Sequence, residues 1–102
     1  MAKGYWIGRV DVSGAEAYQE YVKANAVAFT KFGARFIIRG GAFEIREGTS
    51  RSRNVVIEFP DYQAALDCYD SPEYRQAMSF REGASIADIV IVEGYDGPQP
   101  GD

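Results

Sequence analysis

The sequence contains no histidine and only one cysteine, Cys68. Without histidine, the chain lacks the commonest general base near neutral pH, the Ser-His and Cys-His nucleophile pairs, and the commonest neutral metal ligand. Structural zinc sites are built from cysteine and histidine, so we expect no metal site. A single cysteine forms no internal disulfide, which is typical of a reducing compartment. We therefore expect the protein to be cytoplasmic.

Basic clusters and long apolar runs are also missing. The 11 basic and 15 acidic residues give a formal net charge of -4, and the basic residues form no run. Nucleic-acid binding requires a concentrated positive face, so we expect no nucleic acid as partner. No apolar run approaches the ~20 residues of a membrane-spanning helix, and the start of the chain lacks a signal-peptide core. We expect no membrane partner either.

The chain does have many aromatic rings for its length. Its 102 residues include seven Tyr, six Phe and one Trp, which indicates a rich core or a buried contact surface. This length is typical of one domain. We predict a single domain over residues 1–96, followed by a flexible tail at 97–102 that is rich in Gly and Pro.

Four segments have the composition and alternation of β-strands, with Gly40-Gly41 as a predicted bulge or kink after the second. Residues 42–46 are predicted to continue extended. The polar residues 47–53 predict an exposed hairpin loop. The predicted strands are residues 5–12, 34–40, 54–59 and 86–93.

A first helix is predicted after the first strand. Ser13 and Glu16 have the spacing of a capping box, in which each side chain bonds an unpaired backbone amide of the other. Gly33 is placed to end the helix, because glycine adopts the left-handed conformation readily. The apolar stripe of this helix is predicted to contain Tyr18, Val22, Ala26, Phe29 and Phe32.

A second helix is predicted after the third strand, in two pieces. Pro60 cannot continue the strand ladder, and Asp61 can cap the helix that follows. Ser71 is a second N-cap candidate, and Pro72 suits the first helical position, so the helix restarts there.

The predicted order is β-α-β-β-α-β. Right-handed crossovers fold this order into an α+β domain of the ferredoxin-like, split β-α-β type. Its four-stranded antiparallel sheet carries the helices on one face and leaves the other face uncovered.

Alternation along the strands predicts one wholly apolar face and one mixed face. Phe36 and Ile38 are predicted to share the apolar face, opposite Arg35, Ile37 and Arg39. An uncovered face that mixes aliphatic side chains with isolated charges marks an interface. We therefore predict a homodimer formed through the sheet.

Several motifs in order resemble the DUF1330 family of uncharacterised proteins, within the dimeric α/β-barrel superfamily. The resemblance spans residues 3 to about 95. It implies a ferredoxin-like protomer whose sheet packs on a partner's sheet to form a barrel. The motifs are Gly4-Tyr5-Trp6-Ile7, Arg9-Val10-Asp11-Val12, Arg35-Phe36, Arg39-Gly40-Gly41, Val56-Ile57-Glu58-Phe59-Pro60, Tyr69-Asp70-Ser71-Pro72-Glu73-Tyr74, Arg81 and Asp88-Ile89-Val90-Ile91-Val92-Glu93-Gly94.

The family resemblance implies no particular reaction. Its superfamily includes monooxygenases of antibiotic biosynthesis, haem-degrading monooxygenases and muconolactone-isomerase-like enzymes, whose substrates lie between sheet and helices. The haem-degrading branch is similar to a site with a histidine ligand, which this chain lacks. We expect no cofactor.

Three charged residues at mid-strand positions are the catalytic candidates: Arg39, Glu58 and Asp88, with Arg9 and Asp11 nearby on the first strand. In one interpretation, Arg39 fixes a carboxylate or enolate oxygen while Glu58 or Asp88 acts as a base. In the other, the charges form an ion-pair network that sets sheet register or dimer pairing. The sequence favours the second.

A ligand cleft is the remaining hypothesis. Aromatic residues suited to an apolar cleft are Tyr5, Trp6, Tyr69, Tyr74 and Phe80, although core packing or dimer contact explains them equally well. Arg9 and Arg81 join Tyr5, Trp6 and Tyr69 as predicted ligand-binding residues, with Arg81 as an anion clamp or an ion-pair partner. Cys68 has no visible activator and is predicted to be inert.

Two functions therefore remain open. The first is a homodimeric protein that binds a small organic molecule between sheet and helices, as a cofactor-independent oxygenase or isomerase. The second is a non-catalytic homodimeric module in which the charges are structural.

Overall fold

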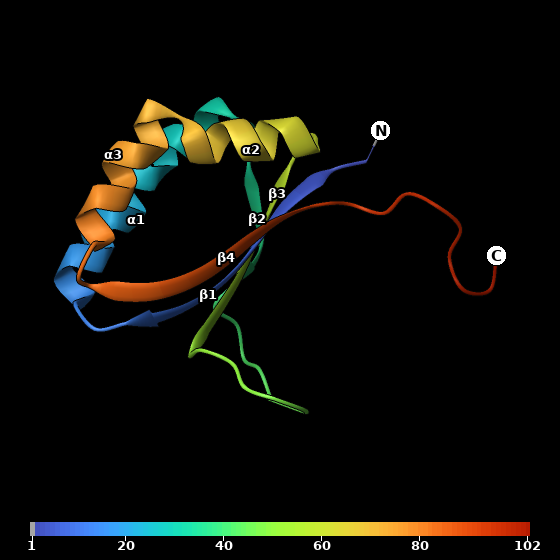
Figure 1. Cartoon of the computed structure of the whole chain (residues 1–102), viewed down its shortest axis with the longest axis horizontal. Helices are drawn as coiled ribbons and strands as arrows, with labels where there is room; N and C mark the ends of the chain where they lie inside the picture. The colour runs from blue at the N-terminus through green and yellow to red at the C-terminus, as the bar shows by residue number, and fades with distance from the viewer. Residues whose placement is uncertain (1) are drawn as a thin grey trace.

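The computed structural model describes residues 2–102. Its helices and strands follow the predicted β-α-β-β-α-β order, with the second helix divided at Ser71 (Figure 1). The elements are β1 (Gly4–Val12), α1 (Ala15–Lys31), β2 (Arg35–Arg39), β3 (Arg53–Phe59), α2 (Tyr62–Asp70), α3 (Pro72–Arg81) and β4 (Ser85–Glu93).

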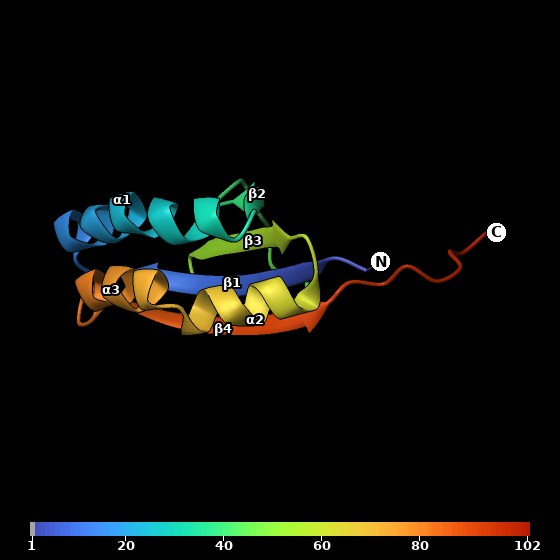
Figure 2. The same cartoon turned by 90° about the horizontal axis from the view of Figure 1, so that it is seen from above.

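The four strands form one antiparallel sheet in the order β2-β3-β1-β4. All three helices cover one face of this sheet, and the other face is bare (Figure 1). Seen from above, α1 lies beside the α2–α3 pair (Figure 2). The predicted ferredoxin-like α+β fold is confirmed.

The predicted N-terminal caps of α2 and α3 are confirmed. Asp61 accepts a hydrogen bond from the Ala64 amide at 2.7 Å, which caps α2. Ser71 accepts one from the Tyr74 amide at 3.1 Å, and Pro72 is the first residue of α3. Side chains that satisfy otherwise unpaired amides explain why the chain starts a new helix here.

The predicted capping box of α1 is wrong. Gly14 is the N-cap residue, and no side chain caps this helix end. The Ser13 and Gly14 amides instead donate to the Ala84 carbonyl, at 2.8 and 2.9 Å. A side chain on Gly14 would meet the Ala84 side chain at 3.0 Å, so this close approach of two chain segments requires a small residue. Gly33 ends the helix region with φ 70°, as predicted.

The buried stripe of α1 is also displaced from its prediction. Ala26 is exposed, while Tyr21 and the polar Asn25 are buried. The side chains of Tyr21 and Asn25 face the polar end of the core, where hydroxyl and guanidinium groups gather. The buried residues of α1 are Tyr18, Tyr21, Asn25, Ala28 and Phe29.

The connection from β2 to β3 differs most from prediction. The loop covers residues 40–52, and residues 42–46 pair with no strand. The bulge lies between Phe36 and Ile38 rather than at Gly40-Gly41. Because the bulge inserts one residue, Ile38 lies opposite Val56 on the bare face and Arg39 lies on the helix side. The predicted facing of Ile38 and Arg39 is therefore wrong.

The core is an aromatic cluster around Trp6. Its ring lies 4.9–5.7 Å from four other rings, those of Phe29, Phe59, Tyr69 and Tyr74. Its indole N–H donates to the Ala65 carbonyl at 2.8 Å, so the one polar atom of the ring is satisfied. The aromatic composition is thus used mainly to fill the space between sheet and helices.

The bare face of the sheet carries exposed aliphatic side chains between charged ones. The loop at 40–52 projects from this side of the sheet (Figure 1). After β4, residues 94–102 form no helix or strand and extend away from the body (Figures 1 and 2). The exposed aliphatic residues of this face are Ile7, Ile38, Ile86, Val90 and Val92.

Candidate functional site

A small cavity lies between the sheet and α1. It has a volume of about 40 Å³, and its walls are almost wholly apolar. A void of this size admits an apolar group of a few heavy atoms. Residues of β1, β3, β4 and α1 line it: Trp6, Gly8, Val10, Tyr21, Val55, Ile57 and Ile89.

The floor of the cavity is Gly8, a buried residue in the middle of β1. Glycine inside a strand weakens it and usually marks a bulge or a close approach. Gly8 has neither: its pairing with Val55 and Ile89 is regular, and an added Cβ would meet only ordinary contacts at 3.7–4.0 Å. The missing side chain leaves room.

Gly4, on the same strand and facing the same side, provides the contrast. A Cβ there would lie 2.7 Å from the Tyr62 Cα and closer still to the Asp61 carbonyl. Packing of α2 on the sheet therefore requires glycine at position 4. No such requirement exists at Gly8.

Arg53 lies beside the cavity at one end. It is the cross-strand partner of the cavity residue Val10, and side chains in such a pair lie about 5 Å apart. Its Nε is buried and has no hydrogen-bond acceptor within residues 2–102. Its guanidinium packs over Gly40, where a Cβ would lie 2.6 Å from Nη1. The chain thus makes room for this cation.

Arg81 approaches the same end from α3. Its guanidinium carbon lies 5.3 Å from the centre of the Tyr21 ring, and Nη2 lies 3.5 Å from the Tyr74 hydroxyl. The Tyr21 and Tyr74 hydroxyls share a hydrogen bond of 2.8 Å. Tyr18 completes this polar end, with its ring centre 5.3 Å from that of Tyr21.

Burial and the two arginines act in opposite directions on the tyrosines. Burial raises the pKa of the Tyr18 hydroxyl, while the nearby Arg53 and Arg81 guanidinium groups oppose the rise. Burial and the Tyr74 hydroxyl raise the pKa of Tyr21 far above its ordinary range. Both tyrosines are therefore neutral hydrogen-bonding groups at physiological pH.

Neither arginine at this end of the cavity is paired with an acid. Within residues 2–102, no carboxylate oxygen lies within 4.0 Å of a nitrogen of Arg53 or Arg81. Both residues are partly buried. Burial lowers the pKa of the Arg81 guanidinium, and the Tyr74 and Tyr21 hydroxyls more than offset this, so Arg81 remains a cation.

The bare face contains a different arrangement, centred on Arg51. Its Nε donates to Asp88 at 2.9 Å and its Nη1 donates to Asp11 at 3.0 Å. The Ser52 amide also donates to Asp11 at 2.8 Å. The Ser52 amide and the Arg51 guanidinium hold the pKa of Asp11 below its usual range.

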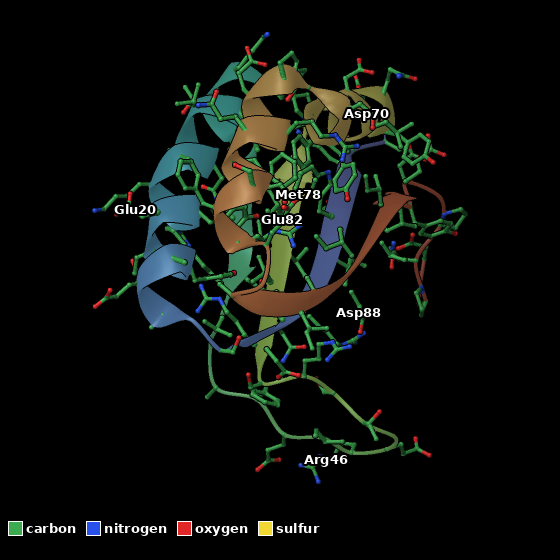
Figure 3. The ribbon with its side chains drawn as sticks, turned by 60° about the vertical axis from the view of Figure 1, so that its left-hand side comes forward. Glu20, Arg46, Asp70, Met78, Glu82 and Asp88 are labelled. Carbon is green, nitrogen blue, oxygen red and sulfur yellow. The ribbon has the colours of Figure 1, made fainter. Side chains whose placement is uncertain are left out.

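Figure 3 shows Asp88 beside β4 and Arg46 at the far end of the 40–52 loop. Asp88 and Asp11 lie on different strands, so Arg51 ties the return of this long loop to the sheet. This is the ion-pair network that the sequence favoured for Asp88, although its arginine was not among the candidates.

The three catalytic candidates are not brought together. Glu58 lies on the bare face, 3.1 Å from the Tyr5 hydroxyl and 3.9 Å from Arg35. Asp88 lies on that face too, but the β1 residue opposite Asp88 is Arg9, whereas the one opposite Glu58 is Tyr5. These four residues of strand separate Glu58 from Asp88 by about 13 Å along the strand direction. Arg39 lies on the helix side, with its guanidinium 4.0 Å from the centre of the Phe36 ring.

The predicted ligand-binding residues are divided between the two faces. Trp6 lines the cavity, and Arg81 lies beside it. Tyr69 packs in the aromatic core, where its ring stacks under Arg75. Tyr5 and Arg9 lie on the bare face. Phe80 is exposed on a groove between α1 and α3, away from the cavity.

Two important residues of the cavity were missed from the sequence. Gly8 was read only as part of a strand, and Arg53 was assigned to the solvated loop. The sequence alternation could have placed Arg53 on the helix side of the sheet. Arg53 is two residues before Val55, and side chains two apart in a strand point to the same face.

Cys68 is fully buried in the core. Burial, and to a lesser extent the Glu73 carboxylate, raises the pKa of its thiol to about 12. A thiol of this kind is not a nucleophile near neutral pH, which agrees with the predicted inertness.

Within residues 2–102, no three acidic, cysteine or histidine side chains gather in a group suited to a metal ion. No helix in the same range is long and apolar enough to cross a membrane.

The fold places the chain among ferredoxin-like α+β proteins, and solved structures share it. A protein of unknown function from Rhodopseudomonas palustris, RPA0582, matches with a TM-score of 0.74 at 18% identity, covering 94% of this chain and 85% of that one. The cofactor-independent oxygenase SnoaB from Streptomyces nogalater matches with a TM-score of 0.63 at 13% identity, covering 100% of both chains. A Bacteroides thetaiotaomicron protein described as a possible oxidoreductase matches with a TM-score of 0.58 at 12% identity, covering 90% of this chain and 97% of that one.

A family model covers nearly the whole chain. Residues 3–95 match the domain of unknown function DUF1330, and the protein belongs to that family. The family resemblance found from the sequence motifs is confirmed. No curated protein matches the chain.

Proposed function

We propose that the protein binds a small organic molecule in the cavity between the sheet and the helices. The observation that carries this proposal is the empty space above Gly8, which no packing contact requires. Filling it with one methyl group would add apolar contact at no steric cost. Glycine at this position leaves the space open to a ligand, which any larger side chain would fill.

We also propose the reaction class as cofactor-independent oxygenation or isomerisation. The likeness to SnoaB supports this direction, since that protein is a cofactor-independent oxygenase of the same fold. A fold hosts many chemistries, so the reaction class depends on the cavity being a binding site.

The bare face supports a second part of the proposal, a homodimer formed through the sheet. Ile7, Val56 and Val90 make a cross-strand row in the middle of this face, and Ile38 extends it at the β2 edge. Exposed aliphatic groups in a contiguous row mark a contact surface. Polar pairs flank the row on its two sides, Tyr5–Glu58 on one and Arg51–Asp88 on the other, and resemble the polar rim of an interface.

Native mass spectrometry of the gently purified protein tests both parts. We expect a dimer mass that carries a stoichiometric additional mass, which can then be released and identified. The matched variant is Gly8→Val, which fills the cavity and is expected to give the dimer without the added mass. An added mass retained by Gly8→Val would place the molecule elsewhere, and a monomer at micromolar concentration would refute the dimer.

The alternative function is a non-catalytic homodimeric module. The Arg51 network favours it for the charges of the bare face, because those charges satisfy one another. Under this alternative the wild-type dimer carries no added mass from any lysate. The predicted cytoplasmic location is in line with either function and with a reduced, buried Cys68.

A further inference from the structure

We infer that the cavity site recognises a carboxylate: the apolar end of a small organic acid enters the space above Gly8, and its carboxylate binds Arg53 and Arg81. This inference rests on the proposed function and names its ligand class. It is carried by two partly buried arginines beside one cavity, neither of which is paired with an acid among residues 2–102.

The absence of acidic partners is selective. The chain has 15 acidic residues against 11 basic ones, so carboxylates are in excess. The fold uses them to pair other cations, as it does for Arg51 with Asp11 and Asp88. A cation that is partly withdrawn from water loses hydration, and proteins normally compensate with an anion. At Arg53 and Arg81, the neighbouring polar groups include tyrosine hydroxyls, and within residues 2–102 no carboxylate pairs with either.

Both arginines reach the same end of the cavity from different elements. Arg53 begins β3 opposite the cavity residue Val10. Arg81 ends α3, with its guanidinium over the ring of the cavity residue Tyr21. Both act on the Tyr18 hydroxyl, so Tyr18 lies within the field of both cations.

The two guanidinium groups have donors to offer a carboxylate. The Nε of Arg53 is a buried donor that finds no acceptor among the described residues. The Arg81 guanidinium makes a long hydrogen bond of 3.5 Å to the Tyr74 hydroxyl and retains further donors. A planar guanidinium binds the two oxygens of a carboxylate in a fork, which a neutral amide does not reproduce.

The size of the cavity limits the apolar end. About 40 Å³ admits a short branched or planar group, while the carboxylate remains among the polar groups at the cavity's end. Val10 and Tyr21 line the cavity, and each also neighbours one of the two arginines. Val10 is the cross-strand partner of Arg53, and the Tyr21 ring lies under the Arg81 guanidinium. We therefore expect small monocarboxylic acids to bind better than long-chain ones.

A titration with isobutyrate and its neutral isostere isobutyramide tests the inference. Chemical shifts of backbone amides in the full-length protein report where each probe binds and with what affinity. We expect isobutyrate to bind about tenfold or more tightly than isobutyramide, since a charge-assisted hydrogen bond contributes at least that factor. The shifts are expected at Gly8 and Val10.

Variants assign this preference to the two arginines. Arg53→Gln and Arg81→Gln are each expected to reduce the preference for isobutyrate to less than about threefold, and Arg53→Lys is expected to retain part of it. Arg46→Gln is the control, because Arg46 lies at the tip of the 40–52 loop and pairs only with Glu44 (Figure 3). Denaturation of each variant without probe shows whether the fold is retained.

The outcomes separate this inference from the proposed function. Equal binding of the two probes, lost in Gly8→Val, would overturn carboxylate recognition and leave a binding cavity. Binding of neither probe would overturn it as well, and the mass of the native protein then decides the proposed function alone. Variants that lose stability but keep the isobutyrate preference would show that the arginines are structural.

Discussion

Arg51 and Arg53 are two residues apart in the chain and lie on opposite faces of the sheet. Arg51 donates to Asp11 and Asp88 on the bare face, at 3.0 and 2.9 Å. Arg53 faces the helices beside a cavity, and no acid in the described part of the chain, residues 2–102, pairs with it. Arginine thus has a different environment on each face: Arg51 fixes a loop to the sheet, and Arg53 is the proposed carboxylate-binding residue.

The faces differ equally in their apolar residues. On the helix side, Phe59 and Trp6 are almost fully buried, and rings interlock around them. On the bare face, Ile86 and Val90 are more than half exposed in the single chain. The helix side therefore stabilises the fold of the single chain, while the bare face is the contact surface of the proposed dimer. Variants on the two faces should accordingly affect different properties, stability on the helix side and association on the bare face.

The largest effect is expected from truncating the helix-side core. Phe59 is 1% exposed and packs against Trp6 and Phe29. Phe59→Ala is expected to lower the free energy of unfolding by about 3–5 kcal/mol, through lost burial and the cavity that remains. Urea denaturation measures it. Val27→Ala is the control at an exposed position of α1, with an expected change within about 0.5 kcal/mol. Similar losses in both variants would contradict the division.

Two glycines of β1 are expected to respond with opposite signs. Gly4→Ala forces a Cβ against the backbone of Asp61 and Tyr62, and should lower the free energy of unfolding by about 1–3 kcal/mol. Gly8→Ala meets only ordinary contacts and should raise it by about 0.4–1 kcal/mol. Denaturation of the two variants side by side measures both. Destabilisation by Gly8→Ala would mean that packing requires this glycine, which removes the main argument for a binding cavity.

A charge on the bare face is expected to weaken the proposed dimer. Val90 lies next to Ile7 in the central row and is 57% exposed. Val90→Lys should lower the association constant about tenfold or more, because two-fold symmetry brings the new charge into the apolar contact twice. Sedimentation equilibrium measures it. Val27→Lys on α1 adds the same charge at a similarly exposed position and should leave association unchanged. Equal behaviour of both variants would place any interface elsewhere.

Much of the fold was predictable because its signals are local. Asp61 and Ser71 bond amides three residues ahead, so their caps depend on sequence alone. The two unlike faces predicted from alternation are present in β3 and β4, where Ile57 and Phe59 are buried while Asp88 and Val90 are exposed.

The errors arose where contacts between distant segments decide the structure. No glycine marks the bulge at Ile37 in the sequence. The bulge turns Ile38 to the bare face and Arg39 to the helix side, opposite to the prediction. Gly14 replaces the expected capping box because it packs against Ala84, seventy residues further along.

The candidate site was less predictable than the fold. Arg81 and Trp6 were expected near a ligand and do lie at the cavity, but Arg39, Glu58 and Asp88 are separated. Those three residues were candidates because a charge inside a strand is costly unless it is paired. The decisive property of Arg53 is the lack of an acidic partner, which only a three-dimensional arrangement reveals.

The smallest effect is expected from the Arg51 network, through its dependence on pH. The pKa of Asp11 in the folded protein lies below its ordinary value of 3.8, because the Ser52 amide and Arg51 stabilise the carboxylate. The unfolded chain therefore binds more protons near that pH. The stabilisation is present above the unfolded pKa and is lost as the pH falls through the folded one. Arg51→Gln removes part of it, so the urea midpoint should fall less steeply between about pH 5 and pH 3 than in wild type. Arg46→Gln should keep the wild-type slope, and an unchanged slope in Arg51→Gln would show that the network does not hold the loop to the sheet.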